Sequence, residues 1–246
     1  MLISRSILAV TDLAPHGNRA VLRAAMLAAQ QRALLKIMYA PLDLDGSIGK
    51  EVDQDVKRLA AEIHSRFNVL VKIVANTGGH LQAVAEEAQW VGVLVIGEHW
   101  EKSTRAFFCG QPIERLQRVV PCPILLARVE ASHRYRRILV ANDFTPCSKK
   151  LLKLARWLDS DAQIESFHAR RSMLGRNDMA SRAVIQQQHA NVDLIVVGKR
   201  RSTGFSDLLF GSEARHALRW SSGDVLLVPH DLRIDTKPEL AASPTA

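Results

Sequence analysis

Short runs of continuous apolar residues alternate with segments of helical spacing along the first half of the chain. In the first such segment, apolar side chains recur at Val21, Leu22, Ala25, Met26 and Ala29, the spacing of one helix face. Apolar strands that are separated by helices indicate a parallel sheet covered on both faces. We therefore predict an open α/β unit of five strands and four helices. The five strands are expected at residues 6–12, 33–40, 69–75, 91–97 and 122–128.

The second half of the chain repeats the first with a deletion. The segment from Ile7 is echoed from Ile138, an offset of 131 residues, whereas the segment from Val93 is echoed from Leu194, an offset of only 101. The second copy is therefore 30 residues shorter, about the length of one helix and one strand. Its remaining strands are expected at residues 137–142, 163–169, 193–197 and 224–228, with a helix at about 178–190.

The repeat divides the chain into two predicted domains and a tail. Residues 1–130 form the first domain and residues 135–230 the second, and a short polar connector joins them. The tail, residues 231–246, has no apolar periodicity and is predicted to be disordered. Because each half alone would expose its last strand and an apolar edge, we expect the halves to pack as an intramolecular pseudo-dimer. A homodimer of the whole chain stays open.

The net charge of +8 lies mostly in the second half and raises the question of a nucleic-acid partner. Residues 1–130 carry 15 basic and 13 acidic side chains, whereas residues 131–246 carry 18 and 12. The excess gathers in three clusters, at residues 133–137, 169–176 and 198–202. Because no recognition helix or aromatic strand platform accompanies them, we do not expect sequence-specific nucleic-acid binding. A non-specific nucleic-acid binder stays an alternative to a solvated basic surface.

Cysteine usage and hydropathy favour a cytoplasmic protein that makes no contact with a membrane. The three cysteines, Cys109, Cys122 and Cys147, are odd in number and have no CxxC spacing, which argues against a disulfide framework and a structural zinc site. The apolar run before Asp12 is too short for a signal peptide, and the sequence has no span of about 18 apolar residues.

The first strand of each copy ends in an aspartate, at the carboxyl end of the sheet where open parallel sheets bind their ligands. Asp12 and Asp143 are placed to accept hydrogen bonds from a ribose or a base, or alternatively to cap the helix that follows. The loop after Gly97 and the loop after Gly198 each lead to a second glycine at a helix start, an arrangement that suits an anion.

The strand that ends in Asp, the helix entry that contains Pro, and a late block of the form Gly-x2-Gly-x9-Gly-Ser/Thr resemble the universal stress protein family. The resemblance covers residues 4–229 in tandem form. It implies two open parallel-sheet domains of Rossmann-like type, the second shortened by about one helix and one strand. It also implies a role in the stress response, pairing into dimers and, in members that keep the block, binding of ATP.

The first copy of the block departs from the family pattern at three positions. Trp100 stands where the family has a glycine that lets the backbone approach closely, and Gln111 replaces the hydroxyl residue. Pro112 removes a backbone amide that could meet a phosphate. We therefore expect no nucleotide in the first domain.

The second copy keeps the block except at its middle glycine, which is replaced by Arg201. With Lys199 and Arg200, Arg201 supplies positive charge that a phosphate could use, or alternatively it fills the cleft. We expect weak ATP or AMP binding in the second domain, with Asp143 near the ribose or base and Ser212 near the phosphates, and no metal ion. The predicted nucleotide-binding residues are Asp143, Ala169, Gly198, Arg200, Arg201, Gly211 and Ser212.

A catalytic site is not visible in the sequence. There is no Ser/His/Asp order, no GxSxG turn and no pair of carboxylates placed for acid–base chemistry. We therefore expect a non-catalytic sensor or interaction module of the stress response. A slow ATPase or kinase-like enzyme that uses the pocket of the second domain is the alternative.

Overall fold

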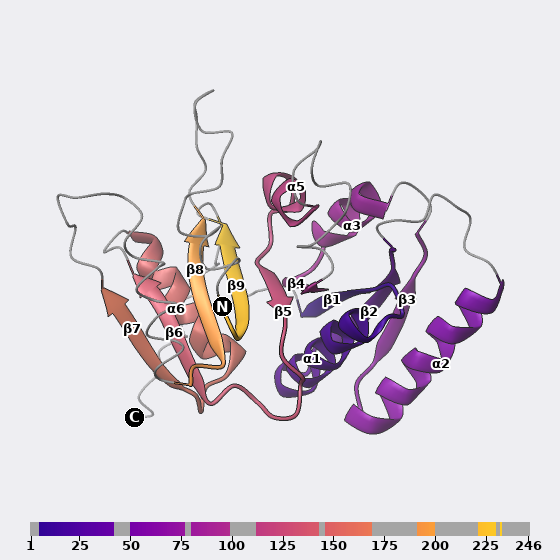
Figure 1. Ribbon diagram of the computed structural model, residues 1–246, viewed down its shortest axis with the longest axis horizontal. Coiled ribbons are helices and arrows are strands. Elements are labelled where there is room, and N and C mark those ends of the chain that lie inside the picture. The colour runs from indigo at the N-terminus through magenta and orange to yellow at the C-terminus, as the bar shows by residue number, and fades with distance from the viewer. Residues whose placement is uncertain are drawn as a thin grey trace, which may run out of the picture.

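The computed structural model describes residues 5–41, 50–76, 80–98, 112–142, 146–168, 191–199, 221–229 and 232 of the chain (Figure 1). Within these residues, the first half contains the five strands and four helices that the hydrophobic pattern predicts. The strands are β1 (Ser6–Thr11), β2 (Leu34–Tyr39), β3 (Val71–Val74), β4 (Val93–Gly97) and β5 (Ile124–Ala127). The helices are α1 (Pro15–Gln31), α2 (Lys50–Phe67), α3 (His80–Ala88) and α5 (Pro112–Val119).

The second half contains the four predicted strands and a helix that follows the first of them. The elements are β6 (Arg137–Asn142), α6 (Pro146–Leu158), β7 (Gln163–His168), β8 (Leu194–Lys199) and β9 (Asp224–Pro229). The predicted helix at 178–190 lies outside the described residues, as does the predicted tail apart from Leu232.

The nine strands found among the described residues form one sheet, in the order β3-β2-β1-β4-β5-β9-β8-β6-β7. The order β9-β8-β6-β7 repeats the order β5-β4-β1-β2, so among the described residues the second half has no counterpart of β3. This is the shortening by one strand that the change in repeat offset predicts. Neighbouring strands are parallel within each half.

The two halves meet where β5 pairs with β9, and these two strands are antiparallel. Leu125 lies opposite Leu226 in this pairing, and both side chains are buried. Because the strand direction reverses here, the carboxyl ends of the first five strands and those of the last four lie at opposite edges of the sheet. The last strand of each half is thereby covered by the other half.

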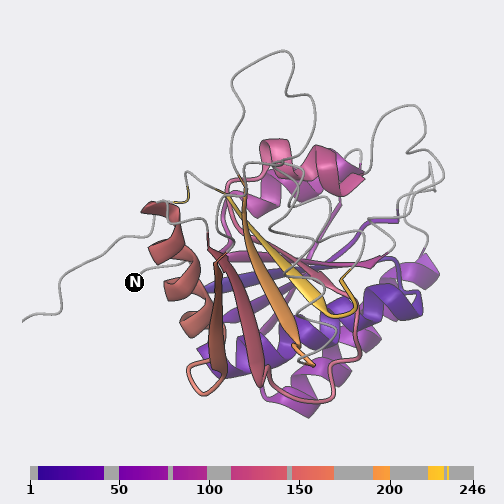
Figure 2. The same cartoon turned by 60° about the vertical axis from the view of Figure 1, so that its left-hand side comes forward.

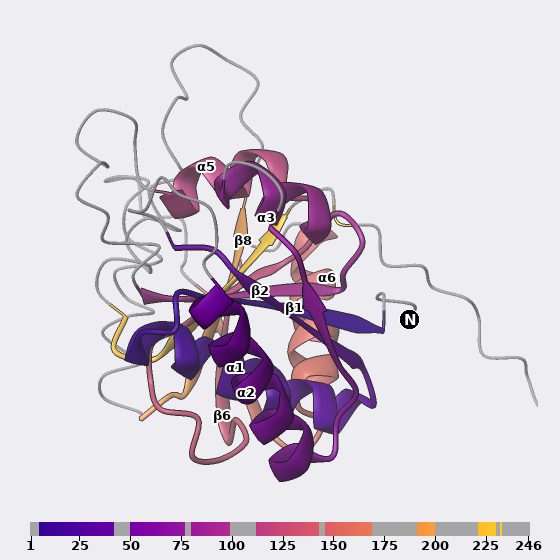
Figure 3. The ribbon, with the colours of Figure 1, turned by 90° about the vertical axis from the view of Figure 1, so that its right-hand side faces the viewer.

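Helices cover both faces of the sheet, as expected for buried parallel strands. Ile7 and Ala9 of β1 face a core formed with α1, α2 and α6, whereas Leu8 and Val10 face a core formed with α3 and α5. Figure 3 shows α1 and α2 on one side of the strands and α3 and α5 on the other. In the described ranges, no helix is long and apolar enough to cross a membrane.

Helix α1 of the first half bonds directly to the end of α6 of the second half. The Gln30 side-chain Nε2 donates to Asp159 Oδ2 at 2.8 Å, and Gln31 Nε2 donates to the backbone carbonyl of Trp157 at 2.6 Å. The apolar residues of both helices also share one core. The halves are therefore joined by helix contacts as well as by the sheet.

Candidate functional site

The carboxyl end of β1 turns into α1 through a loop that two side chains hold. Thr11 Oγ1 accepts a hydrogen bond from the Leu13 N–H at 2.9 Å, and Asp12 Oδ1 accepts one from the Ala14 N–H at 3.0 Å. Leu13 has a φ of 65°, a left-handed conformation that few residues with a branched side chain adopt. Asp12 thus forms a turn before α1 and does not cap the helix, because the N-cap residue is Ala14 and no side chain bonds to the first amides of α1.

Gly17 in the first turn of α1 packs directly on this loop. A Cβ atom at this position would lie 2.4 Å from Asp12 Oδ1, 2.8 Å from Thr11 Oγ1 and 2.9 Å from the Asp12 backbone nitrogen. All three distances are shorter than ordinary van der Waals contact. Only glycine therefore allows the helix to approach the end of β1 so closely.

Tyr39, at the end of the neighbouring strand β2, faces the same edge of the sheet. Burial, and then the negative charge of Asp12, raise the pKa of the Tyr39 phenol above its usual value. Asn76 Nδ2 donates a hydrogen bond to the Tyr39 backbone carbonyl at 3.3 Å. This edge therefore presents a carboxylate beside a phenol that stays protonated.

A second carboxylate lies at the end of β4. Glu98 follows this strand directly, and its Oε2 lies 3.9 Å from Nδ1 of His16 on α1. Pro112 is the first residue of α5, so this helix begins without the backbone amide of that position. Asp12 and Glu98 thus place two carboxylates at this edge of the sheet. Trp100, Gly110 and Gln111 lie outside the described residues.

The edge of the second half that the sequence predicts as a nucleotide site is described in part. Strands β6 and β8 pair in parallel, with Val140 opposite Val196. The same register, continued along both strands, brings Asn142 at the end of β6 level with Gly198 near the end of β8. Gly198 is half-buried. The other predicted site residues, Asp143, Ala169, Arg200, Arg201, Gly211 and Ser212, lie outside the described residues.

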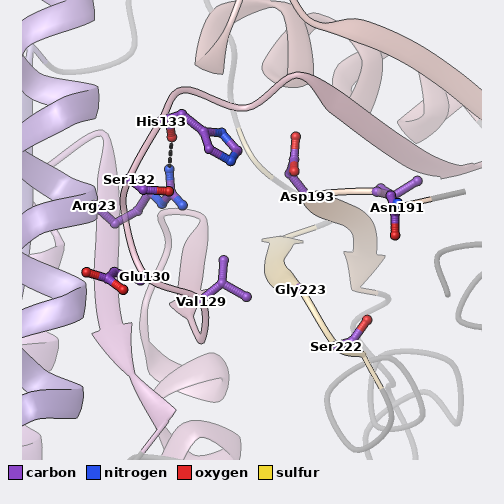
Figure 4. Close-up of a pocket in the computed structure, with 10 residues that line it drawn as sticks. Arg23, Val129, Glu130, Ser132, His133, Asn191, Asp193, Ser222 and Gly223 are labelled. Atoms are coloured by element: carbon purple, nitrogen blue, oxygen red, sulfur yellow. Dashed lines mark hydrogen bonds between the residues drawn. The ribbon is translucent and has the colours of Figure 1, made fainter.

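A different polar site lies where the two halves meet, and the sequence analysis did not single it out. A cavity of about 390 Å³ opens between the connector that follows β5 and the turns that precede β8 and β9. Figure 4 shows Arg23, Ser132 and His133 on one side of it and Asp193 and Ser222 on the other.

Asp224, the first residue of β9, is the centre of the hydrogen bonds beside this cavity. Its Oδ1 accepts the backbone N–H groups of Arg128 at 2.8 Å and Val129 at 3.1 Å. Its Oδ2 accepts the hydroxyl of Tyr135 at 2.6 Å and lies 3.0 Å from Nε of Arg23. A carboxylate with no solvent exposure is therefore compensated by one cation and three hydrogen bonds.

Arg23 and Tyr135 form the rest of the network. The Arg23 guanidinium lies 4.4 Å from the centre of the Tyr135 ring, and its Nη1 donates to the His133 backbone carbonyl at 2.9 Å. Burial and the nearby Asp224 carboxylate raise the pKa of Tyr135 well above its usual value, so the hydroxyl remains a donor. One sequence signal was available, because Arg23 places a charge on the helix face that buries Ala20 and Leu27.

The charged side chains of the junction network are bonded to one another and to the backbone of both halves. Asp193, across the cavity, accepts the backbone N–H groups of Arg136 and Arg137 at its Oδ2, at 2.7 and 2.9 Å. Arg23 is committed to Asp224. In the part of the chain that the structure describes, no group of three or more His, Cys, Asp or Glu side chains could hold a metal ion.

Comparison with known proteins agrees with this architecture. Residues 161–229 match the model of the Universal stress protein family. No curated protein sequence matches the chain significantly. The fold is similar to that of a universal stress protein from Archaeoglobus fulgidus DSM 4304, with a TM-score of 0.72 and 14% sequence identity, over 93% of this chain and 100% of that chain.

Two proteins of Pseudomonas aeruginosa have the same fold. A putative universal stress protein from strain UCBPP-PA14 has a TM-score of 0.66 and 18% identity, over 92% of this chain and 93% of that chain. A functionally unknown protein from strain PAO1 has a TM-score of 0.62 and 18% identity, over 92% of each chain. The predicted resemblance to the universal stress protein family is confirmed for residues 161–229, and the predicted α/β fold class is confirmed over nearly the whole chain.

Proposed function

We propose that this protein is a non-catalytic, cytoplasmic module of the stress response that binds ATP or AMP weakly in its second half. The observation that carries the proposal is the position of the family match. Residues 161–229 include Gly198, Gly211 and Ser212, the three positions at which the second copy keeps the glycine block. The second half is thus the part of the chain with the closest likeness to the family and the more complete block.

The proposed nucleotide site lies at the carboxyl ends of β6 and β8. The sequence predicts that Gly211 and Ser212 place a hydroxyl group and backbone amides at the start of a helix, a combination that suits a phosphate. Arg200 and Arg201 add positive charge beside it. Asp143, one residue beyond β6, is proposed to accept hydrogen bonds from the ribose or base, and Ala169 follows the neighbouring strand β7.

The proposal includes a weak affinity because the second half is the shortened one. Among the described residues it has no counterpart of β3, so one wall that the first half keeps is missing beside the proposed pocket. The proposed units are residues 1–130 and 135–230, which act together as a pseudo-dimer through the β5–β9 pairing. In this proposal the first unit packs against the second and stabilises it, and it does not bind a nucleotide itself.

Isothermal titration calorimetry with ATP and with AMP tests the proposal. The wild-type chain, Gly211→Trp and Gly110→Trp are compared, because the two glycines occupy equivalent positions of the two blocks. We expect weak binding by the wild type, its loss in Gly211→Trp and its retention in Gly110→Trp. The proposal fails if the wild type binds neither nucleotide, or if only Gly110→Trp abolishes binding.

A further inference from the structure

The exposed face of α6 is basic along its whole described length. Lys149, Lys153 and Arg156 are exposed, and residues 146–158 contain no acidic side chain. None of these three cations forms an ion pair with another residue that the structure describes. By contrast, α2 in the first half pairs Lys57 with Asp53 and Arg58 with Asp55. We call Lys149, Lys153 and Arg156 the α6 stripe.

The core fixes the direction in which the α6 stripe points. Leu151, Leu154, Ala155 and Leu158 on the opposite side of α6 are buried in the core that it shares with α1. Figure 2 shows α6 lying outside the strands of the second half. The stripe therefore cannot turn inward without exposing these apolar side chains to water.

Helix geometry places the three cations in one straight row. At about 100° of rotation per residue, positions 149, 153 and 156 fall within a sector of roughly 60°. At about 1.5 Å of rise per residue, the row is roughly 10 Å long. The sequence shows no basic run here, because the helix alone brings residues four and three positions apart onto one line.

Among the residues that the structure describes, the acidic side chains near α6 are turned away or already bonded. Asp159, just beyond the helix, is buried and accepts Gln30 Nε2. Asp161 lies 4.0 Å from Arg134. On the neighbouring strand β7, Ile164 packs into the core that α6 covers, so Glu165 lies on the opposite face of the sheet. The positive potential of the stripe is therefore not cancelled by these groups.

We propose that the α6 stripe binds the phosphate backbone of a nucleic-acid duplex without reading its sequence. A duplex carries one negative charge per about 1.7 Å of its axis when both strands are counted, so a row of roughly 10 Å lies along a stretch of about six charges, roughly three on each strand. A protein partner is disfavoured because the centres of protein interfaces are depleted of lysine and rich in aromatic residues. A membrane is disfavoured because the apolar side of α6 is already buried.

This site is separate from the proposed nucleotide pocket. Helix α6 packs on one face of the sheet, whereas the proposed pocket lies at the edge where β6 and β8 end. A failure of nucleotide binding therefore leaves the α6 inference intact, and the reverse also holds.

Fluorescence anisotropy with a labelled 20-base-pair DNA duplex of arbitrary sequence tests the inference at several NaCl concentrations. The full chain is compared with a variant that combines Lys149→Gln, Lys153→Gln and Arg156→Gln. A control variant combines Lys57→Gln, Arg58→Gln and Lys72→Gln, which removes the same charge from exposed positions of the first half. Circular dichroism melting verifies that all three proteins remain folded.

We expect the wild-type chain to bind with a Kd of about 10⁻⁴ to 10⁻⁶ M at physiological salt. Three phosphate contacts contribute about −2.7 to the slope of log K against log salt, a loss of roughly 40-fold in affinity between 50 and 200 mM NaCl. The stripe variant should lose this part of the slope and the control should keep it. The inference is overturned by equal binding of stripe variant and wild type, by equal losses in stripe variant and control, or by binding to anionic vesicles but not to DNA.

Discussion

Nε of Arg23 on α1 lies 3.0 Å from Oδ2 of Asp224 on β9, and the two side chains are 3% and 0% exposed. The pair therefore joins an early helix to the last strand through charges that water does not reach. Tyr135 donates to the same carboxylate oxygen from the connector between the halves. Three separate parts of the chain thus converge on one buried carboxylate, and its loss should weaken their packing.

Replacing Asp224 with Asn should destabilise the protein by about 3–5 kcal/mol, because it leaves the buried Arg23 guanidinium without a negative partner. The free energy of unfolding is measured by urea denaturation. The matched control is Asp161→Asn, since Asp161 is exposed and lies 4.0 Å from Arg134, and it should change stability by less than about 0.5 kcal/mol. Arg23→Met combined with Asp224→Asn should cost less than the sum of the single changes, and strict additivity would contradict the pairing.

Gly17→Ala should destabilise the protein by about 1–3 kcal/mol, because the new Cβ would lie 2.4 Å from Asp12 Oδ1 and 2.9 Å from the Asp12 backbone nitrogen. Helix propensity alone predicts the opposite sign, a gain of roughly 1 kcal/mol. Urea denaturation distinguishes the two. His16→Ala, at the exposed neighbouring position, controls for general effects on the first turn, and a gain in stability from Gly17→Ala would refute the close approach.

Alkaline pH should destabilise the protein partly through Cys122. Burial raises the pKa of this thiol to about 12, from about 9 in the unfolded chain. As pH rises above 9, the unfolded chain loses the proton first, so stability falls by about 1.4 kcal/mol per pH unit until pH 12. Below pH 9 the thiol contributes no pH dependence.

The variant Cys122→Ala isolates this contribution, because other groups that titrate at high pH are common to both proteins. Unfolding free energies of the two are measured at pH 8, 9.5 and 11. The difference in unfolding free energy between wild type and variant should be constant below pH 9 and should decrease steadily above it. Parallel curves across this range would show that the thiol does not remain protonated in the folded state.

Gln30→Ala should cost about 1–3 kcal/mol, because the Asp159 carboxylate is buried and would lose the donor that lies 2.8 Å from its Oδ2. Chemical denaturation provides the measurement. Gln163→Ala is the control, since the side chain of Gln163 is exposed and its partner Glu165 keeps access to water. Similar effects of the two substitutions would mean that the contact between α1 and α6 adds nothing to stability.

The central strands could be predicted from the sequence because they are short, continuous apolar runs buried on both faces, whereas the two edge strands β3 and β7 are only partly buried. Strand β1, for example, is buried at all six positions and was expected at residues 6–12. The missing counterpart of β3 could be predicted from the change in repeat offset alone. The apolar runs and the repeat offset can both be recognised along the sequence, without knowing which side chains contact one another in the fold.

The junction and the α6 stripe could not be predicted, because they depend on pairing between distant segments. The sequence around Asp224 does not indicate that its partner is Arg23. The two residues come together only because β5 and β9 pair in antiparallel orientation. To predict the α6 stripe, one must know where the helix begins and which of its sides is buried in the core. At the first candidate site, the sequence was compatible with Asp12 either binding a ligand or capping α1. The structure shows that its Oδ1 accepts the Ala14 N–H.

The reversal of strand direction between β5 and β9 also bears on how such a chain can evolve. The carboxyl ends of the two halves lie at opposite edges of the sheet, so a substitution at one of these edges leaves the surroundings of the other unchanged. The backbone hydrogen bonds between β5 and β9, which join the halves, depend little on side-chain identity and are kept after such a substitution. A duplicated fold built on this frame can therefore accumulate substitutions at the carboxyl edge of one half without disturbing that of the other.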